Sequence, residues 1–334
     1  MSIPRPFGAL VVTACLISTL FLAFTTINSP VDEPILTSRS TAYYSGVERT
    51  WNAAANGLAS NPARWDPVGV PATGDNITFD GTSVFNCNWD VVVTLGNFSM
   101  LTGYTGTVTQ TVAFGCVDFT IELGTFTGST TLVLTLEGNL TKTGGIIGGP
   151  PRLTMNGDST FGSNTNELLY NLTIDNDNTV TFEGTVRTYS IYNLNIGLNC
   201  EATLESTVTL RWYDTGQEFT FSNLGVISGA GTFAHHISYT KTVSYGIISV
   251  HTDFIMRDWA SASRIITLGD NANFASITLV SNHLTYTFTL HHGGNYTITA
   301  TGVVMIETRS IMTQGTGAWS FGSYAQTGVD SVFN

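Results

Sequence analysis

The chain has 334 residues, of which 11% are charged, whereas an ordinary soluble domain carries roughly 25%. Acidic residues outnumber basic ones by 24 to 12, which gives a formal net charge of −12 at pH 7. Nucleic-acid binding needs a basic face for the phosphates, so this composition argues against it. Thr, Val, Ile, Tyr and Phe abound while strong helix formers are scarce, so strands are favoured over surface helices.

The first element in chain order is an apolar run over residues 8–24, preceded by Arg5 and followed by a polar stretch. Its length lies between that of the apolar core of a signal peptide, about 7–15 residues, and that of a spanning helix of about 20 residues. A cleaved signal peptide and a retained membrane anchor over residues 1–30 both export the rest of the chain. We therefore expect a secreted or cell-surface protein, with membrane contact through residues 8–24 if the segment is retained.

Short stretches between residues 76 and 318 alternate apolar residues with Thr or Ser and are separated by Gly and Asn, which is typical of strands. A four-residue theme recurs along them: Asn or Asp, an apolar residue, usually Thr or Ser, then usually a second apolar residue. The first three copies follow one another at an even spacing of about 21 residues, and the later spacings vary between roughly 20 and roughly 30. The copies begin at Asn97, Asp118, Asn139, Asn171, Asn193, Asn223, Asp253 and Asn295.

A unit of about 21 residues is too short to bury its own apolar face, so the units must stack as successive coils. We therefore predict an all-β protein whose main domain, 76–318, is a parallel β-solenoid, specifically a right-handed parallel β-helix. The repeated Asn or Asp is expected in a left-handed turn at a coil corner, bonded to the next coil as an asparagine ladder. Tandem β-sandwiches would also fit the length, but they would not produce a theme with this short and regular period.

The segment that precedes the repeats has a different character. Its marked features are Trp51 and Asn52, the sequence Asn61-Pro62-Ala63-Arg64-Trp65-Asp66, Val70-Pro71, Gly74-Asp75-Asn76, and later Gly103-Tyr104-Thr105-Gly106. In these features, residues 51–110 resemble the beginning of secreted bacterial and archaeal cell-surface β-helix proteins of the autotransporter-passenger and adhesin type. The resemblance implies a linker and N-terminal cap over residues 31–75 followed by a right-handed β-helix, and it carries no catalytic motif.

The end of the chain departs from that family, because no barrel-forming segment or sorting tail follows the repeats. A terminal coil with an open strand edge would be prone to association. We therefore expect residues 319–334 to cap the stack or to pair with another subunit in a homo-oligomer.

Cysteines and glycosylation signals leave two alternatives open. With Cys15 in the export segment, Cys87 and Cys116 are candidates for a disulfide in an oxidising compartment, or else Cys87, Cys116 and Cys200 are three buried thiols. Five asparagines lie in N-x-Ser/Thr sequons, but four of them belong to the repeated theme, where Thr or Ser suits the strand. Asn76 lies outside the theme and is the candidate glycosylation site.

The sequence predicts no catalytic set, no cofactor and no metal site. Adjacent residues of a strand point to opposite faces, so neither His235-His236 nor His291-His292 can hold one metal with both rings. The acidic residues are mostly expected in solvated turns: Asp75, Asp80, Asp90, Asp175, Asp177, Asp253, Asp258 and Asp270. A set of aromatic residues is expected mainly inside the stack, with a sugar-stacking face as the alternative: Trp212, Tyr213, Tyr239, Tyr245 and Trp259.

These observations favour an exported, non-enzymatic surface or extracellular protein. It would be an adhesin or a structural envelope component that presents a β-helical face to a carbohydrate or another cell-surface ligand. Two alternatives remain open. A polysaccharide lyase or glycoside hydrolase of the β-helix type would bring at least three acidic or basic side chains together on one sheet face, and a viral or filament subunit would assemble into trimers or fibres.

Overall fold

The structure is a computed structural model that describes residues 46–184, 187–214, 220–256, 262–313, 316–327 and 330–333. In these ranges the chain forms 31 strands and one short 3-10 helix, η1 (Pro62–Arg64). The predicted all-β class is therefore confirmed. The expected export segment over residues 8–24 lies outside the described residues.

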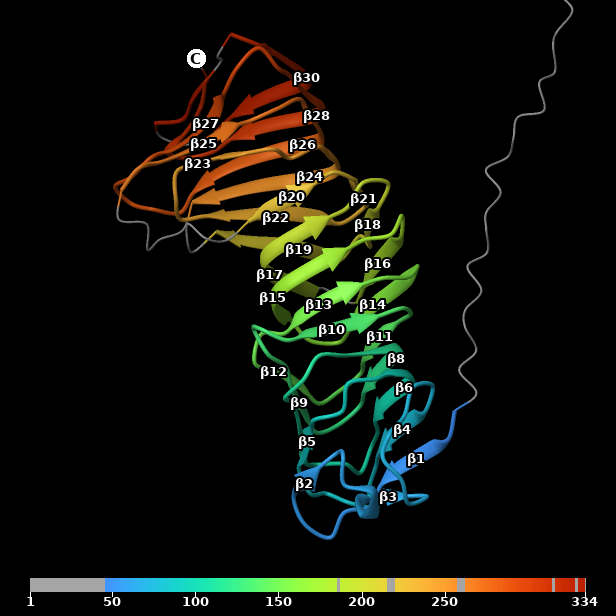
Figure 1. Ribbon diagram of the computed structural model, residues 1–334. Helices are drawn as coiled ribbons and strands as arrows, with labels where there is room; N and C mark the ends of the chain where they lie inside the picture. Colours follow the sequence, from blue (N-terminus) through green and yellow to red (C-terminus); the bar gives the residue numbers. More distant parts are fainter. Residues whose placement is uncertain are drawn as a thin grey trace, which may run out of the picture. The chain divides into compact units, whose positions relative to one another are not determined.

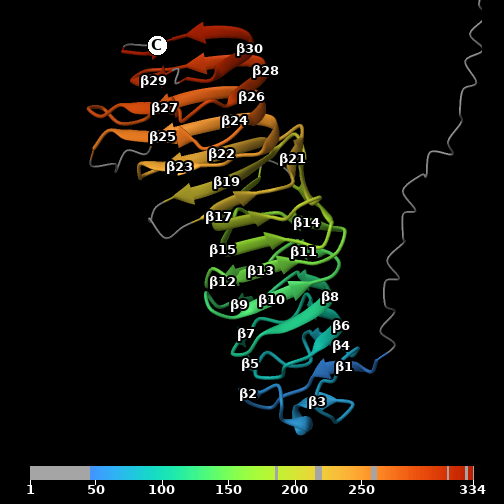
Figure 2. The same cartoon turned by 45° about the horizontal axis from the view of Figure 1, so that its top comes forward.

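The strands stack as about eleven coils of a parallel β-solenoid (Figures 1 and 2), which confirms the predicted architecture. The largest sheet has 21 strands. They are β1 (Glu48–Trp51), β3 (Trp65–Asp66), β4 (Asn76–Phe79), β6 (Thr94–Met100), β8 (Phe114–Ile121), β10 (Val133–Leu136), β11 (Leu140–Lys142), β13 (Arg152–Met155), β14 (Ser159–Ser163), β15 (Glu167–Ile174), β16 (Thr179–Glu183), β17 (Arg187–Ile196), β18 (Glu201–Leu204), β19 (Val208–Asp214), β20 (Phe221–Asn223), β21 (Val226–Gly229), β22 (Thr232–Ile237), β24 (Ile247–Met256), β26 (Ala272–Ser281), β28 (Thr297–Ile306) and β30 (Ala318–Gln326).

Two smaller sheets of five strands each complete the coils. The sheet beside the first coils consists of β2 (Gly57–Leu58), β5 (Cys87–Trp89), β7 (Thr107–Gln110), β9 (Thr125–Thr127) and β12 (Ile146–Gly148). The sheet beside the last coils consists of β23 (Lys241–Val243), β25 (Arg264–Leu268), β27 (Phe288–His292), β29 (Ser310–Thr313) and β31 (Val332–Phe333).

A column of apolar side chains inside the stack explains the repeat. Phe98 pairs in register with Phe119, Phe119 with Leu140, Leu140 with Phe161, and Phe161 with Phe182, each partner one full repeat further along the chain. The rings of Phe98 and Phe119 stack with their centroids 5.0 Å apart and their planes within 7°. Parallel strands lie about 4.8 Å apart, so one coil brings equivalent side chains into direct contact. The period of the theme is thus the length of one coil in this part of the molecule.

Coils in the second half of the chain are longer. His251 in β24 pairs with Ser276 in β26, and these two residues are further apart in the sequence than the paired residues Asn97 and Asp118 of the first coils. The pairing of β24 with β26, β26 with β28, and β28 with β30 also shifts register once in each case. Such shifts mark β-bulges, which bend a strand and change the direction of its side chains. The uneven later spacing of the theme has its origin in these longer coils.

The described part of the segment expected as an N-terminal cap already belongs to the stack. β1 pairs antiparallel with β3 and parallel with β4, so the first coil begins at Glu48. Arg49 Nε donates a hydrogen bond of 2.5 Å to Asp75 Oδ2. Burial alone would raise the pKa of Asp75, but the hydrogen bonds from Arg49 and from two backbone N–H groups lower it below its ordinary value. This ion pair fastens the first coil to the second.

The last coil continues the parallel pairing, because β30 pairs with β28 and β31 with β29. One column of inward-facing side chains near this end consists of Val243, Leu268 and His292, which are paired in register on successive strands. The His292 side chain is only 1% exposed, and neither ring nitrogen has a hydrogen-bond partner among the described residues. A buried polar group without a partner loses the hydrogen bonds that water gives it in the unfolded chain.

Replacing His292 by Leu, the residue below it in the column, should raise the free energy of unfolding by about 1–2 kcal/mol. The gain comes from removing a buried imidazole that has no hydrogen bond. Urea denaturation followed by tryptophan fluorescence measures it. His291→Leu is the control, because His291 Nδ1 lies 2.8 Å from Thr313 Oγ1, so its replacement should bring no gain. A less stable His292→Leu protein would contradict the argument.

Candidate functional site

Several of the repeated Asn and Asp residues join successive coils through their side-chain oxygens. Asn97 and Asp118 are paired in register, and Asn139 occupies the equivalent position one coil further. Oδ1 of Asp118 accepts a hydrogen bond of 2.7 Å from the N–H of Asn139, and Oδ1 of Asn139 accepts one of 2.9 Å from the N–H of Thr160. The expected bond from this theme to the next coil is therefore present, with the backbone of that coil as the donor.

The prediction of a single ladder through all eight positions is wrong. Asn139 is equivalent to Thr160 in the next coil, and Asn171 lies further along that coil, where it pairs with Asn193 as a second short column. Asn223 pairs with Ile196 of the apolar interior and is itself buried. Asp253 pairs with Ala234 and Thr278, and Asn295 precedes β28.

The expected left-handed turn is also absent from these eight positions. Among the described non-glycine residues, positive φ angles occur at Asn176, Asp177, Asn199, Arg309 and Asp330. The theme residues instead lie in or beside strands, and the side-chain oxygens of Asp118, Asn139 and Asn193 accept hydrogen bonds from backbone N–H groups of the next coil. A theme defined along the sequence thus does not stay in one column, because the number of residues between corners changes from coil to coil.

Asn76, the candidate glycosylation site, is bound at both ends of its side chain. Oδ1 accepts a hydrogen bond of 2.8 Å from the N–H of Asn97, and Nδ2 donates one of 2.5 Å to Glu48 Oε1. A glycan is attached through Nδ2, so it would displace Glu48. Modification at Asn76 stays a prediction.

The cysteines take the second of the two arrangements that the sequence allowed. Cys87, Cys116 and Cys200 are free thiols and all three are buried. Cys87 lies in β5 of a small sheet, and Cys116 in β8 of the large sheet, where it pairs with Leu95 and Leu136. Burial raises the pKa of the Cys87 and Cys116 thiols well above the ordinary value, so both stay protonated and act as small apolar side chains.

Most of the acidic residues considered from the sequence serve local contacts. Asp75 pairs with Arg49, and Asp90 accepts hydrogen bonds of 2.8 and 2.6 Å from the N–H and hydroxyl of Ser60. Asp258 lies outside the described residues. Across the ranges that the structure describes, no group of three or more His, Cys, Asp or Glu side chains is placed to hold a metal ion.

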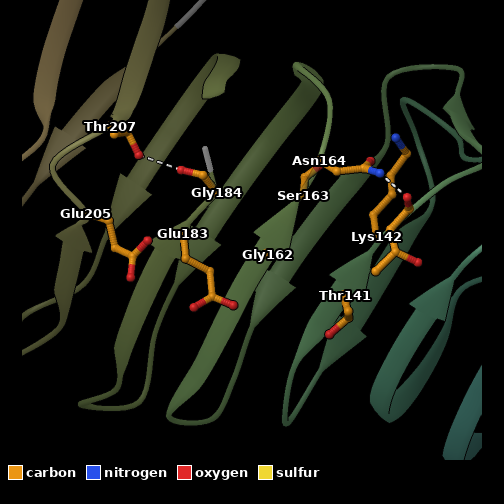
Figure 3. A pocket seen from close by; sticks show the side chains of 10 residues that line it. Thr141, Lys142, Gly162, Ser163, Asn164, Glu183, Gly184, Glu205 and Thr207 are labelled. Carbon is orange, nitrogen blue, oxygen red and sulfur yellow. Dashed lines mark hydrogen bonds between the residues drawn. The ribbon is translucent and has the colours of Figure 1, made fainter. Parts of the chain in front are cut away.

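An open groove of about 400 Å³ crosses four successive coils on the outer face of the large sheet (Figure 3). Gly162 of β14 lies in its middle, paired with Thr141 of the previous coil and with Glu183 of the next. Because glycine has no side chain, the surface between Thr141 and Glu183 stays hollow. Figure 3 shows the carboxylates of Glu183 and Glu205 side by side along the groove.

The rest of the groove is lined by neutral polar side chains. Thr207 Oγ1 donates a hydrogen bond of 2.6 Å to the carbonyl oxygen of Gly184, and Asn164 Nδ2 donates to that of Thr143 (Figure 3). Sequence reasoning missed this site. The signal that could have found it is the separation of Glu183 and Glu205 along the sequence by one coil length.

Beneath the groove lies a buried ion pair. Lys142 Nζ is 3.2 Å from Glu167 Oε1, and both side chains are almost fully buried. Glu167 Oε1 also accepts hydrogen bonds of 2.5 Å from Ser163 and 2.8 Å from Thr165. A buried ion pair is tolerated only where further hydrogen bonds satisfy both charges. This network gives Lys142, one of only two lysines in the chain, a structural role under the groove wall.

A column of rings runs along a second outer face, formed by β15, β17, β19 and β22. Ring centroids of Tyr170 and Tyr192 are 6.3 Å apart, those of Tyr192 and Tyr213 6.1 Å, and those of Tyr213 and His236 5.0 Å. The three tyrosines are partly exposed, and His236 is buried.

The aromatic residues considered from the sequence divide between this outer face and the core. Trp212 and Tyr245 lie inside the stack, as expected, whereas Tyr213 belongs to the outer column. Trp259 lies outside the described residues.

Inside the upper coils a histidine is held between a phenol and a carboxylate. His235 Nδ1 is 2.6 Å from the Tyr245 hydroxyl, and His235 Nε2 is 3.1 Å from Asp214 Oδ2. The N–H of Ser238 donates to Asp214 at 2.5 Å, and Lys241 Nζ lies 3.8 Å from the same carboxylate. His235, Asp214 and Tyr245 are fully buried. No substrate reaches them, so this network is structural.

The chain matches no protein-family model, no curated protein and no solved structure. Within the ranges described, no helix reaches the length and apolar character needed to span a membrane. The geometry of the described residues therefore carries the functional argument by itself.

The buried network should make the protein sensitive to acid. Burial lowers the pKa of His235 below its ordinary value of 6.5, although the hydrogen bond with Asp214 opposes the shift. The unfolded chain takes up this proton more readily than the folded one. Stability from neutral His235 is therefore full above pH 6.5 and is lost as pH falls through the folded pKa.

We expect the free energy of unfolding to fall more steeply between about pH 7 and pH 5 in the wild-type protein than in His235→Gln. Urea titrations at several pH values measure both curves. His251, whose pKa is raised, contributes in the opposite direction, but it is present in both proteins, so the difference isolates His235. Parallel curves would show that His235 does not resist protonation.

Proposed function

We propose that this chain is a surface or extracellular protein of the adhesin type, which binds a carbohydrate polymer along the outer face of its β-solenoid. The observation that carries the proposal is the groove around Gly162. It crosses four coils in the direction of stacking, so it can accept several units of an extended chain. The expected export segment and the low charge of the chain support an extracellular role.

The side chains of the groove suit sugar hydroxyl groups. Glu183 and Glu205 offer carboxylate acceptors, Thr141 offers a hydroxyl that donates or accepts, Thr207 a hydroxyl oxygen that accepts, and Asn164 an amide. Each sugar hydroxyl both donates and accepts hydrogen bonds, so it can pair with all three kinds of group. The column of tyrosines on β15, β17 and β19 adds a second outer surface with partly exposed rings, which suit the apolar faces of sugars.

The alternative of a glycoside hydrolase has one observation in its favour, the two carboxylates on adjacent coils. A glycosidase acid, however, is kept protonated by apolar or enclosed surroundings. Glu205 is exposed and Glu183 only partly buried in an open groove. We therefore assign the pair to binding. Release of reducing sugar from a bound polysaccharide would reverse this assignment.

Filling the groove should abolish glycan binding without harming the fold. In Gly162→Val the new Cβ lies 3.0 Å from Oε1 of Glu183, the end of a flexible side chain, so the valine can be accommodated. Valine also suits a strand better than glycine, so stability should be unchanged or rise by up to about 1 kcal/mol. A glycan array identifies the ligand, and isothermal calorimetry then compares the variant with wild type, with at least a tenfold weaker affinity expected.

Gly148→Val in β12 is the matched control. It adds the same side chain to a different sheet, where the nearest atom to the new Cβ is 3.5 Å away. Binding should be retained in this variant. Equal affinity of Gly162→Val and wild type for every ligand found on the array would refute the groove as the binding site.

A further inference from the structure

Four polar side chains meet on the outer face where β24 pairs with β26. His251 pairs in register with Ser276, and Asp253 pairs with Thr278. His251 Nδ1 is 2.6 Å from Ser276 Oγ, and His251 Nε2 is 2.8 Å from Asp253 Oδ1. Thr278 Oγ1 lies 3.2 Å from the same Nε2. A hydroxyl, an imidazole and a carboxylate thus form a continuous hydrogen-bonded chain.

The direction of the hydrogen bonds follows from their chemistry. A carboxylate only accepts, so Nε2–H of His251 donates to Asp253, and Nδ1 is left to accept the proton of Ser276 Oγ. The bond with Asp253 raises the pKa of His251 above its ordinary value, with burial opposing. The imidazole is therefore a stronger base than a free histidine and is aimed at the serine hydroxyl.

The same order of groups occurs in the buried network of Tyr245, His235 and Asp214, but the two differ in exposure. His235 and Asp214 have fully buried side chains, whereas those of His251 and Asp253 are 40% and 28% exposed. Only the network on β24 and β26 can meet a molecule from solvent. The buried network needs its hydrogen bonds for stability, but an exposed set of this kind gains little stability from them.

The surface next to Ser276 is open. The next coil places Gly302 beside it, with the position of a Gly302 Cβ only 3.4 Å from Ser276 Cβ, and the coil after that places Gly322 against Gly302. Two side-chain-free positions therefore extend from the serine hydroxyl. The pairing of β26 with β28 is also interrupted between Phe274 and Ile277, so peptide groups here lie outside the regular ladder. Bulges of this kind are frequent next to active sites.

We infer that Ser276, His251 and Asp253 form an esterase site, which hydrolyses esters of short-chain carboxylic acids with Ser276 as nucleophile and His251 as general base. Asp253 is a positioning residue, because it holds the imidazole in the tautomer that accepts the serine proton. The strip over Gly302 and Gly322 has room for a small acyl group. The bulky alcohol of a substrate would remain in solvent.

The reaction balances with water as the only co-reactant. Ser276 Oγ bonds to the carbonyl carbon and its proton passes to Nδ1 of His251. The bond from that carbon to the alcohol oxygen then breaks, and the alcohol leaves with the proton. Water attacks the acyl group on Ser276 and gives a proton to His251. The carboxylic acid leaves, and Ser276 Oγ takes the proton back.

Hydrolysis of 4-nitrophenyl acetate by the full chain tests the site. Ser276→Ala and His251→Gln should each lower kcat/KM by about 100-fold or more, with urea unfolding unchanged. His291→Gln is the matched control, because His291 also lies beside a hydroxyl, that of Thr313, and should retain wild-type activity. Gly148→Val, which lies outside both this site and the groove, should retain it as well.

Asp253→Asn should lower kcat by about 100-fold while KM changes little, because the substrate does not touch Asp253. The neighbouring strands place Thr232, Ala234, Ser276 and Thr278 around His251 and Asp253, so Asp253 is the charged group facing the imidazole among these described residues. Nuclear magnetic resonance should therefore show a lower pKa of His251 in this variant. A merely structural Asp253 would leave kcat unchanged even though the pKa of His251 falls.

A fluorophosphonate probe adds a readout independent of turnover. Mass spectrometry should find one adduct on wild type, located at Ser276, and none on Ser276→Ala. Two results would overturn the inference: hydrolysis that survives in Ser276→Ala but is lost in His251→Gln, which would mean that the imidazole acts without a nucleophilic serine, and equal labelling of both proteins.

Discussion

Parallel pairing between equivalent strands of successive coils is the interaction on which every other feature depends. It places each side chain next to its counterpart one coil away, so that one good contact inside the stack is repeated many times. The column through Phe98, Phe119, Leu140 and Phe161 shows this in the interior. Outside, the same constraint aligns Thr141, Gly162 and Glu183 as the groove and brings His251 beside Ser276. The groove and the cluster around His251 are thus consequences of coil geometry.

The same constraint accounts for the unusual composition. Like charges on the surface of a stack would repeat at about 4.8 Å and repel each other along it. Thr and Asn can instead bond to their neighbours above and below. Glu183 and Glu205 are an exception, because two carboxylates lie side by side there. Both lie where the surface is hollow. Two like charges kept side by side on an otherwise weakly charged surface fit a role in binding.

Single residues show which features of the fold could be predicted from the sequence. The period of the repeat could be predicted from the sequence, because Phe98, Phe119 and Leu140 recur at the length of one coil. The sequence could not predict which column a given asparagine joins. Corners differ in length, so Asn171 falls beyond the position equivalent to Asn139. The contact between Ser276 and His251 gave no signal in the sequence, because His251 lies one lengthened coil earlier, at a spacing that the regular repeat does not predict. Contacts that depend on coil length therefore do not follow from the repeat alone.

Asn223 shows what a polar residue inside the stack can do. It occupies a position equivalent to Ile196 in the apolar interior, yet its Nδ2 donates hydrogen bonds of 2.9 and 3.1 Å to the carbonyl oxygens of Tyr245 and Ile247. Apolar columns tolerate a slip in register that keeps the same face inward, because any apolar side chain can replace another. An amide with two fixed acceptors cannot slip without remaining buried and unbonded. Asn223 thus fixes the register of this coil. It destabilises a stack with a shifted register more than it stabilises the correct stack.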